Sequence, residues 1–334
     1  MSDVPARMPP LVTIAIPTFN RAATLPRALD SALAQTHTEL EVIVSDNASS
    51  DATEEICREY AARDGRIRYL RRPANVGPTA NLNGLFLAGQ GRYTQMLADD
   101  DWLDPDCVAV CLARLEERPD HSVVGARARY WRGEELVSTG VNMQLEQENR
   151  CDRAVRYFRT AEDNGTFYGL IRTAALRRAA PMPNVLGNDL VLVGALAFQG
   201  KVATLDAVTV HRDAGGTSAD LGKIVRTLGG GRWQARLPHG TIAAAVARDI
   251  AWRGEVYGEL SPPARLALAT RCAIAAMDWT AQAWYLTDPL VLALEARGTT
   301  RWAAAGYRRL EQGLIARRRR DRAEERDYSA DGAP

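Results

Sequence analysis

Lysine is nearly absent from this sequence of 334 residues. Of the 42 basic residues only Lys201 and Lys223 are lysines, and the formal net charge is +1. A chain without a strong net charge has no long-range field that would draw it to nucleic acid. The arginine run at residues 317–320 has no interleaved aromatic residues on which bases could stack, so we interpret it as a solvated helix face. We therefore predict no nucleic-acid partner.

Cysteine is also scarce and shows no pattern. The five cysteines form no CxxC pair and no Cys/His arrangement of the kind that binds zinc. An odd number of scattered cysteines is typical of reduced core residues in a cytosolic protein. We therefore expect reduced thiols and a cytoplasmic location.

The sequence has no uninterrupted apolar run long enough to cross a membrane. The best candidate, residues 266–286, is broken by Arg271 and Asp278. Residues 1–10 contain no apolar segment like that of a signal peptide. We expect no transmembrane segment, although peripheral contact with a membrane stays open. Without a secretory route, the glycosylation sequons at residues 47–49 and 164–166 are expected to have no consequence.

The first hundred residues alternate between β-branched apolar runs and amphipathic stretches. This pattern predicts strands at 12–16, 41–45, 67–70 and 92–97, and helices at 25–33, 51–63 and 79–88. Such alternation with short links predicts an α/β fold with a mostly parallel sheet flanked by helices. Ligands of such sheets bind at the carboxyl ends of the strands, where the polar segments 17–20, 46–47 and 99–101 all fall.

The pattern changes after about residue 121. We predict a hairpin from strands 122–130 and 135–138, a strand at 166–172, a helix at 189–198 and a broken strand pair at 202–211. Beyond the glycines at 229–231 the chain is expected to be helical, including segments 241–257, 263–285 and a last helix from residue 300.

Three consecutive carboxylates, Asp99, Asp100 and Asp101, follow the fourth predicted strand. Stacked like charges are costly unless a cation or solvent relieves them, and hard oxygen ligands suit Mg²⁺ or Mn²⁺. The alternative is a solvated loop before a helix, with Asp104 as the N-cap and Pro105 as the first helical residue.

Four ordered segments resemble family 2 inverting glycosyltransferases, which have the GT-A fold. They are residues 12–21, 42–51, 75–77 and 97–101. The resemblance covers residues 11–215 and implies a GT-A domain and a metal-dependent enzyme that uses a nucleotide sugar, most simply a UDP-sugar. The helical C-terminal extension is predicted from the sequence pattern alone. Together with the changes of pattern along the chain, the resemblance predicts a nucleotide-sugar-binding half at 1–121, an acceptor-binding half at 122–222 and a helical region at 223–334.

The resemblance also implies roles for particular residues. Asp46 would accept the N3–H of uracil, although an Asx-turn with Ser49 is the alternative. Asp100 and Asp101 would hold Mg²⁺ or Mn²⁺ together with His211, which could instead be a surface histidine. The residues implied in donor binding are Pro17, Thr18, Asn20, Asp46, Asn75, Asp99 and Arg212.

A catalytic base is implied at Asp189, because the segment Gly187-Asn188-Asp189-Leu190 resembles the family's acidic motif. The alternative role for Asp189 is a helix N-cap. Ala98 and Asn188 depart from the family pattern, so a catalytically impaired sugar-nucleotide-binding or scaffolding protein remains the alternative function. The acceptor is expected to be a glycan or a natural-product or carrier-bound scaffold, and any homodimer is expected to form through the C-terminal helices.

Overall fold

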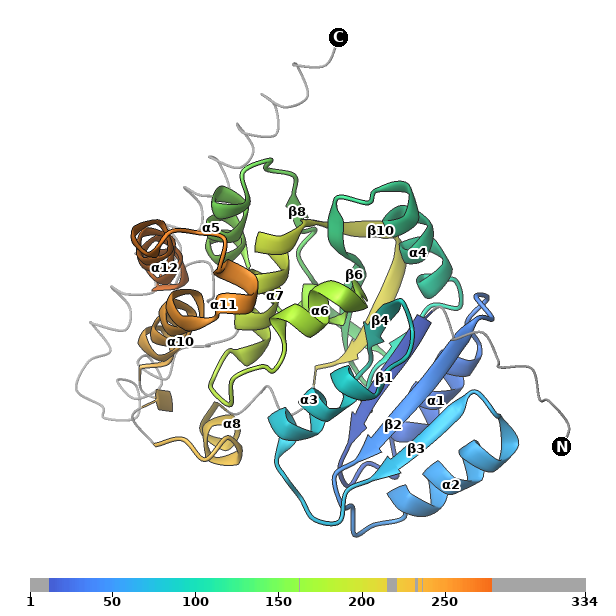
Figure 1. Cartoon of the computed structure of the whole chain (residues 1–334). Helices are drawn as coiled ribbons and strands as arrows, with labels where there is room; N and C mark the ends of the chain where they lie inside the picture. The colour runs from blue at the N-terminus through green and yellow to red at the C-terminus, as the bar shows by residue number, and fades with distance from the viewer. Residues whose placement is uncertain (1–11, 162, 215–220, 232–233, 236, 278–334) are drawn as a thin grey trace, which may run out of the picture.

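The computed structural model describes residues 12–161, 163–214, 221–231, 234–235 and 237–277. Within these ranges a ten-stranded mixed sheet runs through the molecule (Figure 1). Eight strands follow one another in the order β3-β2-β1-β4-β9-β6-β10-β5, while β7 pairs with β6 and β8 pairs with β10.

The N-terminal half of the sheet is parallel and alternates with helices, as predicted. Strands β1 to β4 pair in parallel, and nearly all residues of β1, β2 and β4 are buried, as expected for parallel strands covered by helices on both faces. The elements are β1 (Val12–Thr18), α1 (Leu25–Leu33), β2 (Leu40–Asp46), α2 (Thr53–Arg63), β3 (Ile67–Arg71), α3 (Pro78–Ala88) and β4 (Tyr93–Met96).

The second half of the sheet mixes directions. The predicted hairpin is confirmed as the antiparallel pair of β6 and β7. Strand β9 is antiparallel to both β4 and β6, and β10 is parallel to β6. The elements are β5 (Trp102–Leu103), α4 (Cys107–Glu117), β6 (His121–Arg132), β7 (Glu135–Thr139), β8 (Gln144–Leu145), α5 (Arg150–Thr160), the 3-10 helix η1 (Gly165–Tyr168), β9 (Leu170–Arg172), α6 (Thr173–Ala179), α7 (Asn188–Gln199) and β10 (Lys201–Asp213).

Two predictions for this half were wrong in detail. The strand expected at 166–172 is a 3-10 helix up to Tyr168 and a strand only from Leu170. The broken strand pair at 202–211 is one strand, β10, whose pairing with β6 is interrupted by a register shift between Leu205 and Thr209. A bulge bends a strand without ending it, which explains why the sequence pattern looked broken.

Helices cover both faces of the sheet. Helices α1, α2 and α4 share one apolar core with alternate residues of β1, such as Ile14 and Ile16. Helices α3, α5, α6 and α7 share the other core, which includes Ala15 and Ile43 from the opposite face of the strands. Because β6 and β10 run in the same direction as β1, the carboxyl ends of all the parallel strands meet at one edge.

The described residues after β10 are helical, in α8 (Leu221–Thr227), α10 (Pro238–Trp252), α11 (Gly254–Tyr257) and α12 (Pro262–Met277). Helices α10 and α12 pack on each other and on α7 and α5, respectively (Figure 1). Of the helices described, none is long and apolar enough to span a bilayer. The predicted helix from residue 300 and the arginine run lie outside the described residues.

Candidate active site

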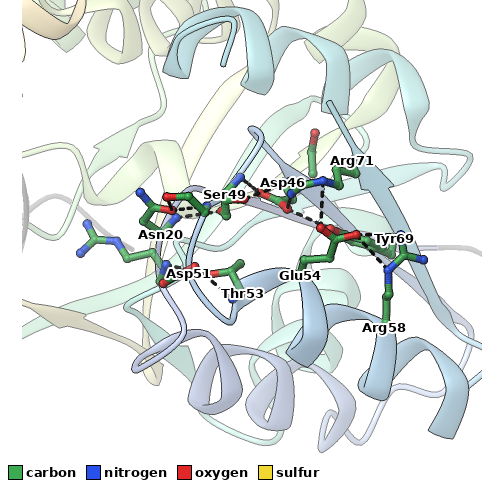
Figure 2. A network of polar contacts seen from close by, with 12 residues as sticks. Asn20, Asp46, Ser49, Asp51, Thr53, Glu54, Arg58, Tyr69 and Arg71 are labelled. Atoms are coloured by element: carbon green, nitrogen blue, oxygen red, sulfur yellow. Dashed lines mark hydrogen bonds and ion pairs between the residues drawn. The ribbon is translucent and has the colours of Figure 1, made fainter. Parts of the chain in front are cut away.

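Asp46 ends β2 and is fully buried beneath the loop that follows it. Its Oδ1 accepts the backbone N–H of Ser49 at 2.8 Å, and its Oδ2 accepts the hydroxyl of Tyr69 at 2.8 Å. The guanidinium of Arg71 forms an ion pair with the same Oδ2 (Figure 2). The Asx-turn with Ser49 is therefore present, and base recognition by Asp46 stays a prediction. Neither Tyr69 nor Arg71 was expected at this site, because both come from β3.

Three asparagines tie the neighbouring loops together. Asn20 takes the left-handed conformation, with φ 54°, and its Oδ1 accepts the N–H of Ser50 at 2.8 Å. Asn47 donates to Oδ1 of Asn75 at 2.9 Å and accepts the N–H of Val76 at 2.9 Å. The predicted donor residues Asn20 and Asn75 thus shape the loops after β1 and β3. Pro17 and Thr18 end β1 beside them.

Asp99 and Asp100 follow β4 and lie against Arg21. Arg21 Nε is 3.4 Å from Oδ1 of Asp99, and its NH2 is 3.5 Å from Oδ2 of Asp100. Burial raises the pKa of Asp99 to about 7, and the nearby charge of Asp100 adds to the rise. The charge of Arg21 opposes the rise only in part. Of the three consecutive carboxylates, Asp99 and Asp100 thus lie close enough for their charges to repel, and Arg21 lies near both.

Asp101 faces a different strand. Its Oδ2 accepts Nε of Arg212 at 3.0 Å and its Oδ1 accepts the backbone N–H of Asp213 at 3.0 Å. Only 1% of Asp101 is exposed, so this carboxylate locks the end of β10 onto the loop after β4. Burial raises its pKa, an effect that the charge of Arg212 opposes.

His211 lies in an aromatic cluster. Its ring stacks on Trp102 with a centroid distance of 5.0 Å, and its Nδ1 accepts the indole N–H of Trp131 at 3.0 Å. Its Nε2 is 2.8 Å from Oδ1 of Asp104. Both ring nitrogens are therefore engaged, and His211 would have to exchange a partner before it could bind a cation. Helix α4 begins at Cys107 with Asp106 at the N-cap position, so the predicted N-cap Asp104 and first helical residue Pro105 are wrong.

Asp189 lies in the first turn of α7 and is not its N-cap. The cap is Gly187, which has φ 75°, so capping by Asp189 itself is excluded. A Cβ at Gly187 would lie 2.8 Å from Cγ1 of Ile242, which is why a glycine fits here. Oδ1 of Asp189 accepts the N–H of Leu190 at 2.9 Å, and its Oδ2 accepts Nδ2 of Asn164 at 3.1 Å.

Asn164 connects Asp189 on α7 to the end of β10. It also accepts a hydrogen bond from NH1 of Arg212, the residue that binds Asp101. The structure thus brings together Asp101, Arg212 and Asp189, all predicted site residues, through an asparagine that was not predicted. Its only sequence signal was the glycosylation sequon at 164–166, which points to different chemistry.

Carboxylate oxygens of the loop at 99–101 suit a divalent cation, but they are not gathered into a preformed cluster. Within the described ranges, no three His, Cys, Asp or Glu side chains lie close enough to hold a metal ion. The charge repulsion between Asp99 and Asp100 nevertheless favours a cation. Both oxygens of Asp101 already accept hydrogen bonds, from Arg212 and from the N–H of Asp213, so Asp101, like His211, would have to exchange a partner to bind a cation. Metal binding by Asp100, Asp101 and His211 stays a prediction.

The chain is similar to known proteins both in sequence and in structure. A chondroitin synthase from Escherichia coli is 34% identical over 149 residues, which is 44% of this chain and 21% of the relative. The structure of Staphylococcus aureus TarS 1–349 in complex with UDP superimposes with a TM-score of 0.52 at 14% identity, over 82% of this chain and 90% of that one.

The mannosyltransferase PcManGT from Pyrobaculum calidifontis, in complex with GDP-Man and Mn²⁺, gives a TM-score of 0.52 at 20% identity, over 93% of this chain and 86% of that one. At these identities the two structures show a shared GT-A-like fold, which confirms the predicted fold class. The family model "Glycosyl transferase family 2" matches residues 13–179, half of the chain. Asp189, His211 and Arg212 lie beyond that match. The protein belongs to glycosyl transferase family 2.

Proposed function

We propose that this chain is a metal-dependent inverting glycosyltransferase that moves a sugar from a UDP-sugar to an acceptor hydroxyl or amine. The observation that carries the proposal is the joining of Asp189, on α7, to Asp101, after β4, in a member of this family. A carboxylate on the acceptor side and carboxylates on the donor side are the two groups that direct displacement needs.

The donor is assigned to the loops after β1, β2 and β4. The named complexes of TarS with UDP and of PcManGT with GDP-Man support a nucleotide-sugar donor for this chain. Asp46, held by Ser49, Tyr69 and Arg71, is a fixed acceptor at the end of β2. A buried acceptor with a fixed orientation suits the imide N–H of uracil.

Asp100 and Asp101 would hold the divalent cation, which when bound neutralises the charge that builds on the leaving diphosphate. Arg212, 8% exposed and paired with Asp101, places a permanent positive charge at the same edge. Arg21 places a second one between Asp99 and Asp100.

Asp189 is the proposed base. As the acceptor oxygen or nitrogen attacks the anomeric carbon, its proton passes to the Asp189 carboxylate, and the bond between that carbon and the diphosphate oxygen breaks. A single displacement of this kind inverts the anomeric configuration. The similarity to a chondroitin synthase supports a glycan acceptor, and a carrier-bound scaffold offers the same nucleophile.

Release of UDP or GDP from UDP-Glc, UDP-GlcNAc, UDP-GlcA and GDP-Man, each with Mn²⁺, Mg²⁺ or EDTA, tests the proposal. We expect turnover with a UDP-sugar that requires the metal. The Asp189→Asn variant should lose about 10²–10⁴-fold in kcat while UDP binding is retained. Asp152→Asn is the matched control, because Asp152 also lies in a first helical turn, that of α5, and should change neither.

Two results would contradict the proposal. Turnover that persists in EDTA would refute the proposed metal requirement. Near wild-type turnover by Asp189→Asn would refute the proposed role of Asp189 as the base. Binding of UDP without turnover of any donor would favour the alternative of a sugar-nucleotide-binding protein.

A further inference from the structure

Four side chains from four separate segments form one hydrogen-bonded path across the candidate active site. Asp101 Oδ2 accepts Nε of Arg212 at 3.0 Å, NH1 of Arg212 donates to Oδ1 of Asn164, and Nδ2 of Asn164 donates to Oδ2 of Asp189 at 3.1 Å. The residues come from the loop after β4, the end of β10, the turn before η1 and the first turn of α7. The path therefore joins the donor-side carboxylates to the acceptor-side carboxylate.

The chemistry of the two neighbours fixes how the Asn164 amide is oriented. A guanidinium can only donate hydrogen bonds, and an ionised carboxylate can only accept them. Asn164 therefore has to turn its oxygen to Arg212 and its NH₂ group to Asp189. Neither aspartate nor leucine, the residues of similar shape, could serve both neighbours.

The backbone around Asn164 is held independently of the amide. Asp163 accepts the N–H of Gly165 with Oδ1 and the N–H of Val141 with Oδ2, each at 2.8 Å. The carbonyl of Asn164 accepts the N–H of Phe167 at 3.0 Å. The guanidinium of Arg212 lies 4.0 Å from the ring centroid of Tyr168, in the same 3-10 helix. Because its backbone is held in this way, the Asn164 side chain can fix the position of the Asp189 carboxylate.

We propose that Asn164 is a positioning residue that holds the Asp189 carboxylate in register with Arg212 and Asp101. The inference rests on the proposed function, because it assigns Asn164 an effect on the base. Asn164 bonds both Asp189 and Arg212, so a role through the base predicts that its loss lowers the rate of the displacement more than it weakens donor binding.

Replacing Asn164 by alanine or aspartate tests this. Asn164→Ala removes both hydrogen bonds, and we expect kcat to fall about 10–100-fold, with the KM for the donor changed less than about threefold, because a small displacement of a reacting group can cost this much. Asn164→Asp keeps an acceptor for Arg212 but sets a second carboxylate against Asp189. It should therefore lower kcat at least as much as alanine does.

The assay is UDP release from the donor that gives the highest metal-dependent turnover. Asn83→Ala is the matched control, because the Asn83 amide also makes two hydrogen bonds, both to the backbone of Met182, away from the path. It should lower stability without lowering kcat. If Asn164 served only to hold Arg212, Asn164→Asp would be more active than Asn164→Ala. That result would overturn the proposal.

Double variants separate this inference from the proposed function. If Asn164 acts through Asp189, Asn164→Ala should lower kcat less than about threefold in an Asp189→Asn background. Full activity of Asp189→Asn would refute the proposed base itself. A fall in kcat on Asp189→Asn but none on Asn164→Ala would leave the base and refute the positioning role. A double-mutant cycle in urea unfolding with Asn164→Ala and Asp189→Ala measures the contact independently of turnover, and no coupling there would also refute it.

Discussion

At the scale of single residues, three aspartates of the active-site edge each hold a segment of the chain in addition to their proposed role. Asp46 holds Ser49 and Arg71, Asp101 holds the end of β10, and Asp189 holds Asn164. Such bonds orient the carboxylates before a ligand arrives, and preorganised groups interact more strongly with developing charge than groups that must first be ordered. A substitution at any of them should therefore change stability as well as the step in which that residue is proposed to act.

Asp46→Asn separates these two effects. The variant replaces the buried carboxylate that accepts from Ser49, Tyr69 and Arg71 by an amide with a single acceptor oxygen. We expect the free energy of unfolding to fall by about 1–3 kcal/mol, because one buried donor loses its acceptor. Wild-type protein should bind UDP more tightly than CDP, which lacks the imide N–H, and the variant should lose that preference. Urea unfolding and calorimetric titration with Mn²⁺ present measure the two quantities.

The control is Glu54→Gln. Glu54 is the other carboxylate beside Arg71, at 3.1 Å from its Nε, and is partly exposed. Its loss should cost less than about 1 kcal/mol, as for a surface ion pair, and should leave the preference for UDP intact. An Asp46→Asn protein that still prefers UDP to CDP would show that Asp46 is a structural residue only.

At the scale of elements, the position of the proposed base depends on how the chain enters α7. The chain enters the helix through Gly187 in the left-handed conformation, directly against Ile242 of α10. The predicted helix started at Asp189, close to the observed start at Asn188. The sequence could not show the contact with Ile242, because that residue is 55 positions further along the chain.

Gly187→Ala tests this entry into α7. The left-handed backbone alone costs an alanine about 1–2 kcal/mol, and the close contact with Ile242 should add about 1–3 kcal/mol. Gly133→Ala is the control, because Gly133 has φ 61° but nothing within 4 Å of an added Cβ. In urea unfolding Gly187→Ala should lose more stability than Gly133→Ala. Equal losses would mean that α10 does not restrain the start of α7.

At the scale of the whole molecule, the sequence predicted best what depends on local pattern. The strands and helices up to residue 97 were correct because buried β-branched runs and amphipathic helices have distinct periodicities. Asp46 and Asp99 could be placed at the same edge of the sheet, because each follows a strand that is parallel to β1. The Arg71–Asp46 contact depends on which strand lies beside β2, and the Asn164–Asp189 contact joins a turn to a helix 25 positions along the chain. Local sequence pattern could therefore predict neither contact. The boundaries at 121 and 222 stay predictions, although strands from both sides of residue 121 share the sheet.

The described helices after β10 (α8, α10, α11 and α12) share one apolar core with α5 and α7, and thiol reactivity can test this. Cys272 of α12 has 0% exposure and belongs to the same apolar cluster as α5 and α7. Burial raises the pKa of its thiol to about 12, and the pKa of the Cys57 thiol in the opposite core is raised to about 12 by the same cause. A neutral, buried thiol is a poor nucleophile.

We therefore expect Ellman's reagent at pH 8 to modify one thiol quickly in the native protein, that of half-buried Cys151. Cys151→Ser should abolish this fast phase and serves as the control. The thiols of Cys57, Cys107, Cys111 and Cys272 should react together, at the urea concentration where the protein unfolds, because one cooperative unit exposes all its buried groups at once. If Cys272 instead reacts before the other three, α12 opens separately from the sheet, and the C-terminal helices are an independent unit of stability.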